Sequence, residues 1–577
     1  MMKSEYIFRS LVSLILAITF IGISSSTLAQ DNQGEASTVV YPASYFTEFS
    51  PVSAQDMLDR IPGASGGSSG GGSFRGGGPP SFSRGGGGRG GRGFGSGSSQ
   101  SEILINGKRT AGKNNSTGGQ LNRITADQVD YIEIIRGTSG ELDVRGSGQV
   151  INVVLFEQLS SSSISYEASV QRSRDHTVSP RADLSYSGQQ GGLNFLLNVQ
   201  SQDVYFNSIS KENSILGDFS PNDLVREDRV SDGHSTQIST NLDYQINTNS
   251  SARLNALIRE GDSETELDRH TTDLKVNPNL IAMQREATPT NTENWELGGD
   301  YEFNTSSGDR FKVLFISNKA FFGNVRDRWN VAEDGSEDKN LFLDSSSTTR
   351  ERIVRGSYTM DIAEGQDIEF GAERAQTILD SNLALGLASG EGAPSAAYGG
   401  LIPVSVSNAN SSVEEIRYEP FLIHNWVINS RMSLESSLLY ELSEISQSGD
   451  VSNKRDFDFF KPKVDFRYDL TPRLQLRGSI EKIVEQLSFN DFVAATDNRD
   501  EDSNIQAGNE NLSQEWYWKY DINAEYRLPN DVGVVNGSIF YEDWTDRIER
   551  IDVSASEDRL QAANGNVGEG YKYGMNL

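Results

Sequence analysis

The sequence of 577 residues contains no cysteine, which excludes a disulfide framework and any thiol chemistry. Histidine is almost as rare, and no nucleophile elbow or phosphate-binding loop occurs. The four histidines are scattered, without the spacing of metal ligands: His176, His234, His270 and His424. We therefore expect no enzymatic activity, no metal site and no cofactor.

Basic residues are also few, since 51 Lys and Arg stand against 81 Asp and Glu, giving a formal net charge of −30. A charge of this sign and size argues against nucleic acid as a partner. It predicts acidic loops and an acidic outer rim instead.

Long hydrophobic runs are missing after residue 29. Lys3 and Arg9 precede the apolar run 11–23, and small residues lead to Ala29. This pattern predicts a secretory signal peptide over residues 1–29, with an N-terminal anchor helix as the alternative. An exported chain with only 36% hydrophobic residues, yet rich in short alternating strands, is a large soluble β protein or a membrane barrel.

The clearest local pattern consists of two β-branched runs, 129–135 and 150–155, joined by a link of glycines and charges. Alone, it fits an ordinary hairpin of an α/β domain. The order Ile-Glu-Ile-Ile-Arg-Gly, then Arg-Gly-Ser-Gly-Gln-Val-Ile-Asn-Val, resembles the end of the plug domain of TonB-dependent outer-membrane receptors. The resemblance implies an antiparallel transmembrane β-barrel, which is a membrane all-β fold, with a small α+β plug inside.

Three further segments fit a plug domain over residues 51–157. Residues 51–63 read as a helix with Ser53 as N-cap, and they resemble the family's Asp-x-Leu-x-x-Ile-Pro-Gly helix. Residues 103–109 read as a strand entering an Asn-Gly hairpin turn, similar to the family's Ile-Leu-Ile-Asp-Gly-x-Arg. A second helix is predicted for 119–127.

The N-terminal periplasmic segment 30–50 contains a short apolar stretch before a proline. The resemblance implies that this stretch is a TonB box, which pairs as an added strand with the energy-transducing TonB protein. The alternative is that it forms the first strand of the plug. The residues concerned are Thr38, Val39, Val40 and Tyr41.

The resemblance also implies a set of functional residues in the plug. Glu133 and Arg136 match residues that form ion pairs with the barrel wall. Arg92 and Phe94, in a Gly/Arg-rich insert over 64–101, match an apex loop that could contact an anionic or aromatic ligand. The alternatives for this insert are a low-complexity segment without a binding role and, less in keeping with an exported acidic protein, an RNA-binding tract.

From residue 158 to 577 the sequence reads as strands joined alternately by tight turns and by long polar connections, such as 205–233 and 380–413. Alternation places Phe311, Val313 and Phe315 on one face and Lys312 on the other. Aromatic residues near strand ends could form interface girdles: Tyr440, Tyr468, Trp516, Trp518, Tyr526, Trp544 and Tyr573.

A late segment, Asn509 to Glu515, resembles the family's Asn-x-x-Leu-x-x-Glu. The pattern gives roughly 16 strands after the plug, where barrels of this family have about 22. No terminal Phe or Trp closes the chain, so we expect a barrel truncated at its C-terminus. A barrel of roughly 16 strands is the alternative.

The resemblance implies TonB-dependent active transport of a scarce ligand across the outer membrane of a Gram-negative bacterium. A ferric siderophore, cobalamin, haem or an oligosaccharide would be such a ligand. The expected partners are the TonB complex, the ligand and outer-membrane lipid. The alternatives are an exported β-rich adhesin or binding protein and a non-functional receptor fragment.

Overall fold

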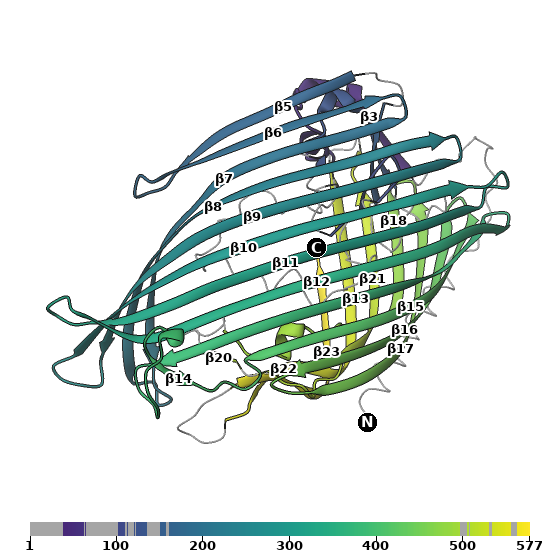
Figure 1. Cartoon of the computed structure of the whole chain (residues 1–577). Coiled ribbons are helices and arrows are strands. Elements are labelled where there is room, and N and C mark those ends of the chain that lie inside the picture. The colour runs from purple at the N-terminus through teal and green to yellow at the C-terminus, as the bar shows by residue number, and fades with distance from the viewer. Residues whose placement is uncertain are drawn as a thin grey trace. The chain divides into compact units, whose positions relative to one another are not determined.

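The computed structural model describes residues 38–62, 64, 102–109, 112–113, 120–121, 123–135, 150–156, 161–496, 505–506, 508–529, 533–554 and 562–577. These residues form a small mixed sheet with short helices and a large antiparallel barrel sheet (Figure 1). The predicted signal peptide, Arg92, Phe94 and Arg136 lie outside the described residues.

The small sheet, which we call the plug sheet, has the strand order β1-β3-β4-β2. Its central strands are β3 (Val129–Ile135) and β4 (Val150–Leu155), which pair antiparallel as predicted. β1 (Thr38–Pro42) lies antiparallel to β3 at one edge, and β2 (Glu102–Ile105) lies parallel to β4 at the other.

The predicted hairpin over 103–109 needs correction. A tight turn does form, because Asn106 and Gly107 take positive φ values of 51° and 74°. Yet β2 pairs in parallel with β4, and a single bridge from Ile105 to Lys108 closes the turn. The Asn-Gly pair was read correctly as a turn, but a turn alone does not identify the partner strand.

One helical turn precedes the insert, α2 (Ala54–Leu58), and it is shorter than the predicted 51–63. Ser53 caps it in a capping box, since the Ser53 side chain accepts from the Asp56 N–H while Asp56 accepts from the Ser53 N–H. Two 3₁₀ turns complete the plug, η1 (Ala43–Phe49) and η3 (Ala126–Gln128).

The plug has a main hydrophobic core and a smaller cluster formed by Leu104, Ile135 and Val150. The main core includes the side chains predicted to face the sheet from the 119–127 segment and β3: Leu121, Ile124 and Val129. The other buried members are Tyr41, Phe46, Ala54, Met57, Leu58, Ile61, Ala64, Ile132, Ile134, Ile151 and Val153. The described part of the plug therefore carries an apolar core of its own.

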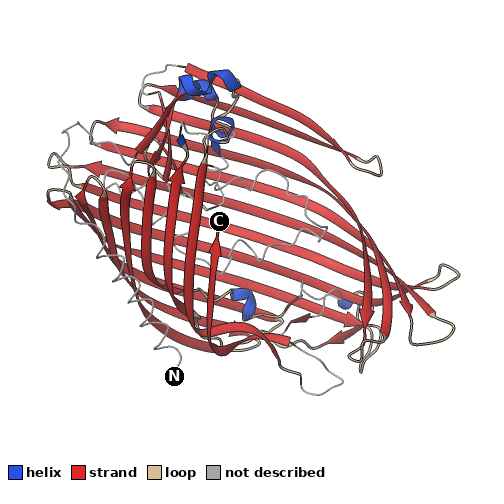
Figure 2. Cartoon of the chain, turned by 180° about the vertical axis from the view of Figure 1, so that it is seen from behind, coloured by secondary structure: helices blue, strands red, loops and turns tan. Residues whose placement is uncertain are grey.

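Among the described residues, 17 antiparallel strands follow in the order of a closed barrel, including the three-residue β14. Figure 2 shows this sheet. In chain order the strands are β5 (Ser161–Arg172), β6 (Val178–Gln190), β7 (Leu193–Ile215), β8 (Pro221–Asn247), β9 (Ser250–Asp273), β10 (Leu280–Asn304), β11 (Arg310–Val331), β12 (Glu337–Ala363), β13 (Gln366–Leu387), β14 (Ile402–Val404), β15 (Asn410–Asn429), β16 (Met432–Gly449), β17 (Asn453–Thr471), β18 (Leu474–Val484), β21 (Trp516–Arg527), β22 (Val534–Asp552) and β23 (Ala562–Asn576).

The longer connections between these strands carry small elements of their own. The link from β13 to β15 contains η4 (Ala396–Tyr398) and β14. The link from β18 to β21 contains η5 (Phe489–Asp491) and the two-residue strands β19 (Ala495–Thr496) and β20 (Ile505–Gln506).

Several strands are much longer than the sequence pattern suggested. β8 has 27 residues, and the predicted polar connection 205–233 is a paired part of β7 and β8. Similarly, 380–413 contains the end of β13 and the start of β15. Polar side chains at the outer ends of these strands face water on both sides, so they lack the alternation that marks a strand in sequence.

Inside and outside differ as expected for a membrane barrel. On β11, Phe311 and Phe315 are each 39% exposed on the outer face, whereas Lys312 is 7% exposed and faces inward. Outward apolar side chains recur on the neighbouring strands, including Val354, Phe370, Tyr418, Leu422, Leu438, Phe460, Ile480 and Ile522. None of the described helices is long and apolar enough to cross a membrane.

Candidate functional site: the plug against the barrel wall

The candidate TonB-box residues form β1, so the structure has them as the first strand of the plug. Thr38 pairs with Ile135 and Tyr41 with Ile132. Tyr41 is 3% exposed in the plug core, whereas Val40 is 52% exposed. In β1, Tyr41 is therefore fixed in the plug core, whereas the adjacent Val40 is accessible.

Glu133 lies half-buried on β3 and accepts a 2.7 Å hydrogen bond from the Asn152 side chain on β4. Asn152 in turn accepts a 2.7 Å bond from the Gly107 N–H. The described contact of Glu133 therefore lies within the plug. The predicted ion pairing of Glu133 and Arg136 with the barrel wall stays a prediction, and Arg136 is not among the described residues.

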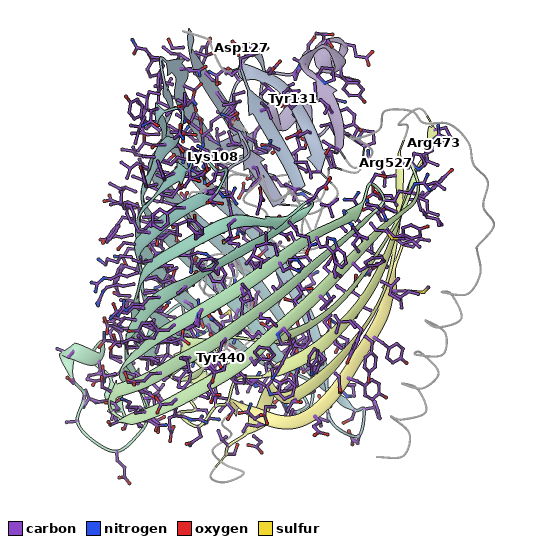
Figure 3. All side chains as sticks on the ribbon, turned by 90° about the vertical axis from the view of Figure 1, so that its right-hand side faces the viewer. Lys108, Asp127, Tyr131, Tyr440, Arg473 and Arg527 are labelled. Carbon is purple, nitrogen blue, oxygen red and sulfur yellow. The ribbon has the colours of Figure 1, made fainter. Side chains whose placement is uncertain are left out.

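The plug touches the wall through several separate polar contacts near the short turns of the barrel. Figure 3 shows Lys108, Asp127 and Tyr131 of the plug in the same half of the molecule as Arg473 and Arg527, and Tyr440 in the other half. The contacts are Lys108 Nζ to Ser251 Oγ at 2.7 Å, Arg123 Nη1 to Ser239 Oγ at 2.7 Å, Gln128 Nε2 to Ser187 Oγ at 2.9 Å and Arg527 Nη1 to Tyr41 Oη at 3.4 Å.

A stronger contact lies at Lys113. The Lys113 ammonium donates to both oxygens of Glu351 on β12, at 2.8 and 2.9 Å, and the Lys113 N–H donates to Glu296 on β10 at 3.1 Å. The Lys113 and Glu351 side chains are 27% and 12% exposed. An ion pair at such a wet but enclosed boundary holds the two bodies together, yet water can replace it.

Between the plug and strands β6 to β9 lies a cavity of about 100 Å³. Lys108 and Gln128 line it from the plug, and Asn194, Asn241 and Arg253 line it from the wall. Within the described residues, Asn241 Oδ1 is buried without a hydrogen-bond partner. Apolar side chains of both bodies, including Ile105 and Phe195, complete the lining. A cavity of this size has room for a few water molecules beside its polar groups.

The inner wall beyond the plug carries a dense charge network. Glu373 on β13 lies between Arg417 at 2.8 Å and Arg355 at 3.5 Å, with Glu373 and Arg417 side chains 1% and 3% exposed. Lys461 on β17 likewise lies between Glu419 and Glu441. These pairs cross from strand to strand and satisfy charges that would otherwise be buried alone.

Part of the link from β18 to β21 folds onto this inner wall. Leu487, Phe489, Phe492, Val493 and Leu512 of the link pack against wall residues Leu379, Val413, Ile445 and Ile548. The segment that resembles Asn-x-x-Leu-x-x-Glu contributes both to this packing and to polar contacts. Leu512 is fully buried, and Glu515 accepts a 2.8 Å bond from the Ile548 N–H.

A pocket of about 530 Å³ opens beside this link and is lined by residues of β21, β22 and β23 together with Glu485 and Glu515 of the link. Trp544 stacks on Tyr517 with ring centroids 3.9 Å apart, and the Arg547 guanidinium lies 4.3 Å from the Trp544 ring centroid. Arg547 also lies 3.4 Å from Glu515, and Lys572 lies 3.6 Å from Glu542. The carboxylates are buried, while Arg547 and Lys572 keep 34% and 63% exposure.

Trp544 corrects one prediction, because it faces inward and does not belong to an outer girdle. It is in register with Tyr517, and it shares the inward face of β22 with Glu542. Strand alternation could have predicted this orientation. Ile539 and Tyr541 face outward, so Trp544, an odd number of residues away from both, faces inward. Tyr440, by contrast, is 39% exposed on the outer face.

Sequence reasoning missed Lys113, Arg123, Gln128, Arg547 and Lys572. Each is a single polar residue in a turn, a short 3₁₀ segment or a strand, and its partner lies far along the chain. No local pattern identifies such a residue. Among the described residues no group of three or more His, Asp or Glu is placed to hold a metal ion.

The fold and these contacts define an outer-membrane β-barrel with an internal plug. Two family models match the chain: the TonB-dependent receptor plug domain over residues 31–149, and the TonB-dependent receptor-like β-barrel over residues 228–577. The protein belongs to the TonB-dependent receptor family, whose members are transporters and receptors of the outer membrane.

Solved structures give more distant likenesses. The siderophore receptor PirA of Pseudomonas aeruginosa is 13% identical over 94% of this chain and 81% of its own, with a TM-score of 0.46. The alcaligin receptor FauA of Bordetella pertussis is 11% identical over 82% and 68%, with a TM-score of 0.38. The hemophore receptor HasR of Serratia marcescens, in complex with HasA and heme, is 11% identical over 82% and 71%, with a TM-score of 0.46. The search of curated proteins gives no match.

Proposed function

We propose that the protein carries out TonB-dependent active transport of a scarce ligand across the outer membrane. The candidate ligands are a ferric siderophore, cobalamin or an oligosaccharide. Membership of the receptor family supports the transport class, and the polar inner wall supports passage of a polar ligand.

The observation that carries this proposal is the way in which the plug is held. Its described polar contacts with the wall are hydrogen bonds and an ion pair, at separate points. The cavity beside them has room for water that can take over the same hydrogen bonds. Contacts of this kind break one at a time, at a cost far below that of unpacking an apolar interface of the same area.

Coupling to TonB is proposed for Thr38, Val39, Val40 and Tyr41. β1 is an edge strand of the plug sheet, and its register links Thr38 directly to Ile135. A partner that binds β1 as an added strand and pulls would therefore act on β3 and on the link that follows it. Because Tyr41 belongs to the plug core, the more exposed Val40 is the residue best suited for substitution.

Ligand contact is proposed for Arg92 and Phe94 in the apex insert, and plug-wall ion pairing for Glu133 and Arg136. On the wall, the pocket with Arg547 and Lys572 offers two exposed cations above buried carboxylates. Trp544 holds the Arg547 guanidinium in place by stacking. A ligand bound between apex and wall would touch both bodies at once.

The test uses a host strain that lacks its own receptors, expressing the full chain. Uptake of four labelled probes is compared: a ferric catecholate siderophore, cobalamin, haem and a maltooligosaccharide. We expect one probe to accumulate, and only in cells with a functional TonB and an energised inner membrane. Uptake that persists without TonB, or surface binding of a probe without entry, would refute active transport and favour the binding-protein alternative.

A further inference from the structure

The outer face of the barrel separates its charges by sign across strands β7 to β13, which run side by side (Figure 1). On β9, Arg253 and Asn255 line the cavity beside the plug and therefore face inward. Side chains alternate along a strand, and the pairing of β9 with β10 has no register shift, so Glu260, Asp262 and Glu264 face outward. All three are exposed.

Strand register places outward carboxylates in three neighbouring rows of β7 to β10, which we call the acidic patch: Asp203, Asp232, Glu260, Asp262, Glu264 and Glu293. In the middle row, Asp262 pairs with His234, and His234 pairs with Asp203. The remaining outward positions in these described rows contain no Lys or Arg: Ser201, Tyr205, His234, Thr236, Pro289 and Asn291. Residues in register point the same way and lie within contact distance, so the patch is continuous.

A basic patch lies beside the acidic patch, on β11 to β13, and consists of Lys319, Arg350, Arg352 and Arg374. The outward direction of its arginines follows from their neighbours, because Glu351 faces inward to Lys113 and Glu373 is buried among the inner charges. Lys319 is in register with Arg350, so it points the same way. The other outward positions in these described rows contain no carboxylate: Phe315, Ser317, Val354, Gln376 and Ile378.

Most of the acidic patch lacks a cationic partner. His234 lies 2.7 Å from Asp203, and Lys319 of the basic patch lies 3.9 Å from Glu293, at the border between the two patches. Among the described residues, the other members make no hydrogen bond or ion pair: Asp232, Glu260, Asp262 and Glu264.

The basic patch is similarly short of carboxylates. Arg350 contacts Asp380. Among the described residues, Arg352 contacts only the Gln376 amide, at 3.5 Å, and Arg374 lies 5.9 Å from the Tyr418 ring centroid. The centres of the two patches cannot neutralise each other inside one copy, because β9 and β12 are three strands apart, which corresponds to about 14 Å.

The acidic patch lies beyond the apolar band of the barrel, on the side of the long connections. Ile238 and Ile258 belong to the outward row just before it and are 53% and 57% exposed. β9 then continues to Asp273, and β8 and β9 have 27 and 24 residues, whereas a membrane-spanning strand needs about 9–11. This charged face therefore lies in water next to the membrane, where another protein can reach it.

We propose that the acidic patch of one copy of this chain binds the basic patch of a neighbouring copy, so that the barrels associate side by side in the membrane. Copies in one membrane share the same orientation, and both patches lie on one wall, so patches of opposite sign can face each other between copies. The contact supplies arginines to carboxylates that lack a cation within one copy. This inference uses only the outer face of the barrel and is independent of the transport proposal.

The first test measures the mass of the full chain in a nonionic detergent by analytical ultracentrifugation. We expect dimers or larger assemblies at low salt and monomers at high salt, since salt screens exposed charges. The variant Glu260→Arg, Asp262→Arg and the variant Arg352→Glu, Arg374→Glu should each associate roughly tenfold more weakly than the wild type. An equimolar mixture of the two should associate again, because each then offers the charge that the other lacks. The control Lys454→Glu, at an outward cation on β17, should behave like the wild type.

The second test locates the contact. The chain has no cysteine, so Asp262→Cys in one protein and Arg352→Cys in another, mixed and treated with a short bis-maleimide, should give a cross-linked pair that neither protein gives alone. Each variant is compared only if its heat-modifiable band on gels matches the wild type. A wild type that stays monomeric at low salt, a mixture of the two reversed variants that fails to associate, or the absence of the mixed cross-linked product would overturn the proposal.

Discussion

The plug and the inner wall of the barrel are both buried, but they are held by different forces. The plug core consists of apolar side chains from β1, η1, α2, β3 and β4. The inner wall is held by buried ion pairs such as Arg417 with Glu373 and Lys461 with Glu441. Between the two bodies, hydroxyl, amide and ammonium groups form the described hydrogen bonds, beside a cavity that is also lined by apolar side chains.

The contrast indicates which contacts of the molecule break most easily. Apolar burial is non-directional and keeps the plug intact as a body. Buried ion pairs fix the strands of the wall and are costly to break singly. The hydrogen bonds between plug and wall are neither apolar burial nor buried ion pairs of the inner wall, because water can replace each of them. The predictions below test that separation, from the largest effect to the smallest.

Replacing Phe46 with Ala should weaken the plug without unfolding the barrel. Phe46 is fully buried in the plug core, so the change should destabilise the plug by about 3–5 kcal/mol. Hydrogen exchange of plug amides in increasing urea measures this. Val52→Ala, at a position 70% exposed, is the control. Simultaneous loss of protection in barrel and plug would show that the plug does not unfold independently of the barrel.

Replacing Arg417 with Met should weaken the wall and leave the plug alone. The change removes the closer of the two arginines beside Glu373 and leaves Arg355 at 3.5 Å, and a broken buried pair costs about 3–5 kcal/mol. The temperature at which the heat-modifiable gel band shifts reports on it. The exposed pair of Lys454 with Glu444 is the control, and Lys454→Met should shift that temperature much less. Similar shifts for both variants would contradict the assigned role of burial.

Replacing Lys113 with Met should loosen the plug in its place. The two hydrogen bonds from the ammonium to Glu351 are lost, whereas the Lys113 N–H still donates to Glu296, and the expected cost at this partly exposed site is about 1–2 kcal/mol. Hydrogen exchange of plug amides should rise while wall amides stay protected. A double-mutant cycle with Glu351→Gln isolates the pair. A coupling energy of zero would mean that Lys113 contributes nothing to plug retention.

Replacing Ser53 with Ala should remove the helix cap of α2 at a cost of about 1 kcal/mol. The same exchange measurement, restricted to residues 53–62, detects it. Ser53→Asp keeps an acceptor at the cap and should stay close to the wild type. If Ser53→Asp behaves like Ser53→Ala, the capping hydrogen bond is not what stabilises this turn.

The smallest effect concerns pH at the turn between β5 and β6. Hydrogen bonds from Tyr205 and Asn207 lower the pKa of the Asp175 carboxyl below its usual 3.8. Because the pKa is lowered on folding, the contribution of Asp175 is present above pH 3.8 and fades only as the solution becomes more acidic. The protection factors of amides 173–177, which correct for the intrinsic pH dependence of exchange, should therefore be unchanged from pH 7 to 5. An increase within that range would contradict this origin.

Much of the fold could be predicted from local sequence patterns. The β-branched runs of β3 and β4, the Ser53 cap and the alternation of Phe311, Lys312 and Phe315 each depend on near neighbours, and the structure confirms them. The parallel pairing of β2 and the full length of β8 were missed. Both depend on partners far along the chain, or on water at both faces of a strand.

The site was harder to predict for the same reason. Thr38 to Tyr41 were identified from sequence as a distinct segment, and they form one strand. The roles of Lys113, Gln128 and Arg547 could not be predicted, because they depend on contacts with Glu351, Ser187 and Trp544. Pairs separated by tens to hundreds of residues leave no periodic mark in sequence. Trp544 alone was predictable, from the parity of its own strand.

The most direct test of the account asks whether the plug must leave the wall for transport. The chain has no cysteine, so Gln128→Cys with Ser187→Cys introduces one pair at a contact of 2.9 Å, which a short bis-maleimide can join. We predict that the joined protein still binds the transported probe but no longer imports it, while each single variant imports normally. Import at the wild-type rate by the joined protein would show that the plug does not move away from the wall at this contact, contrary to the account.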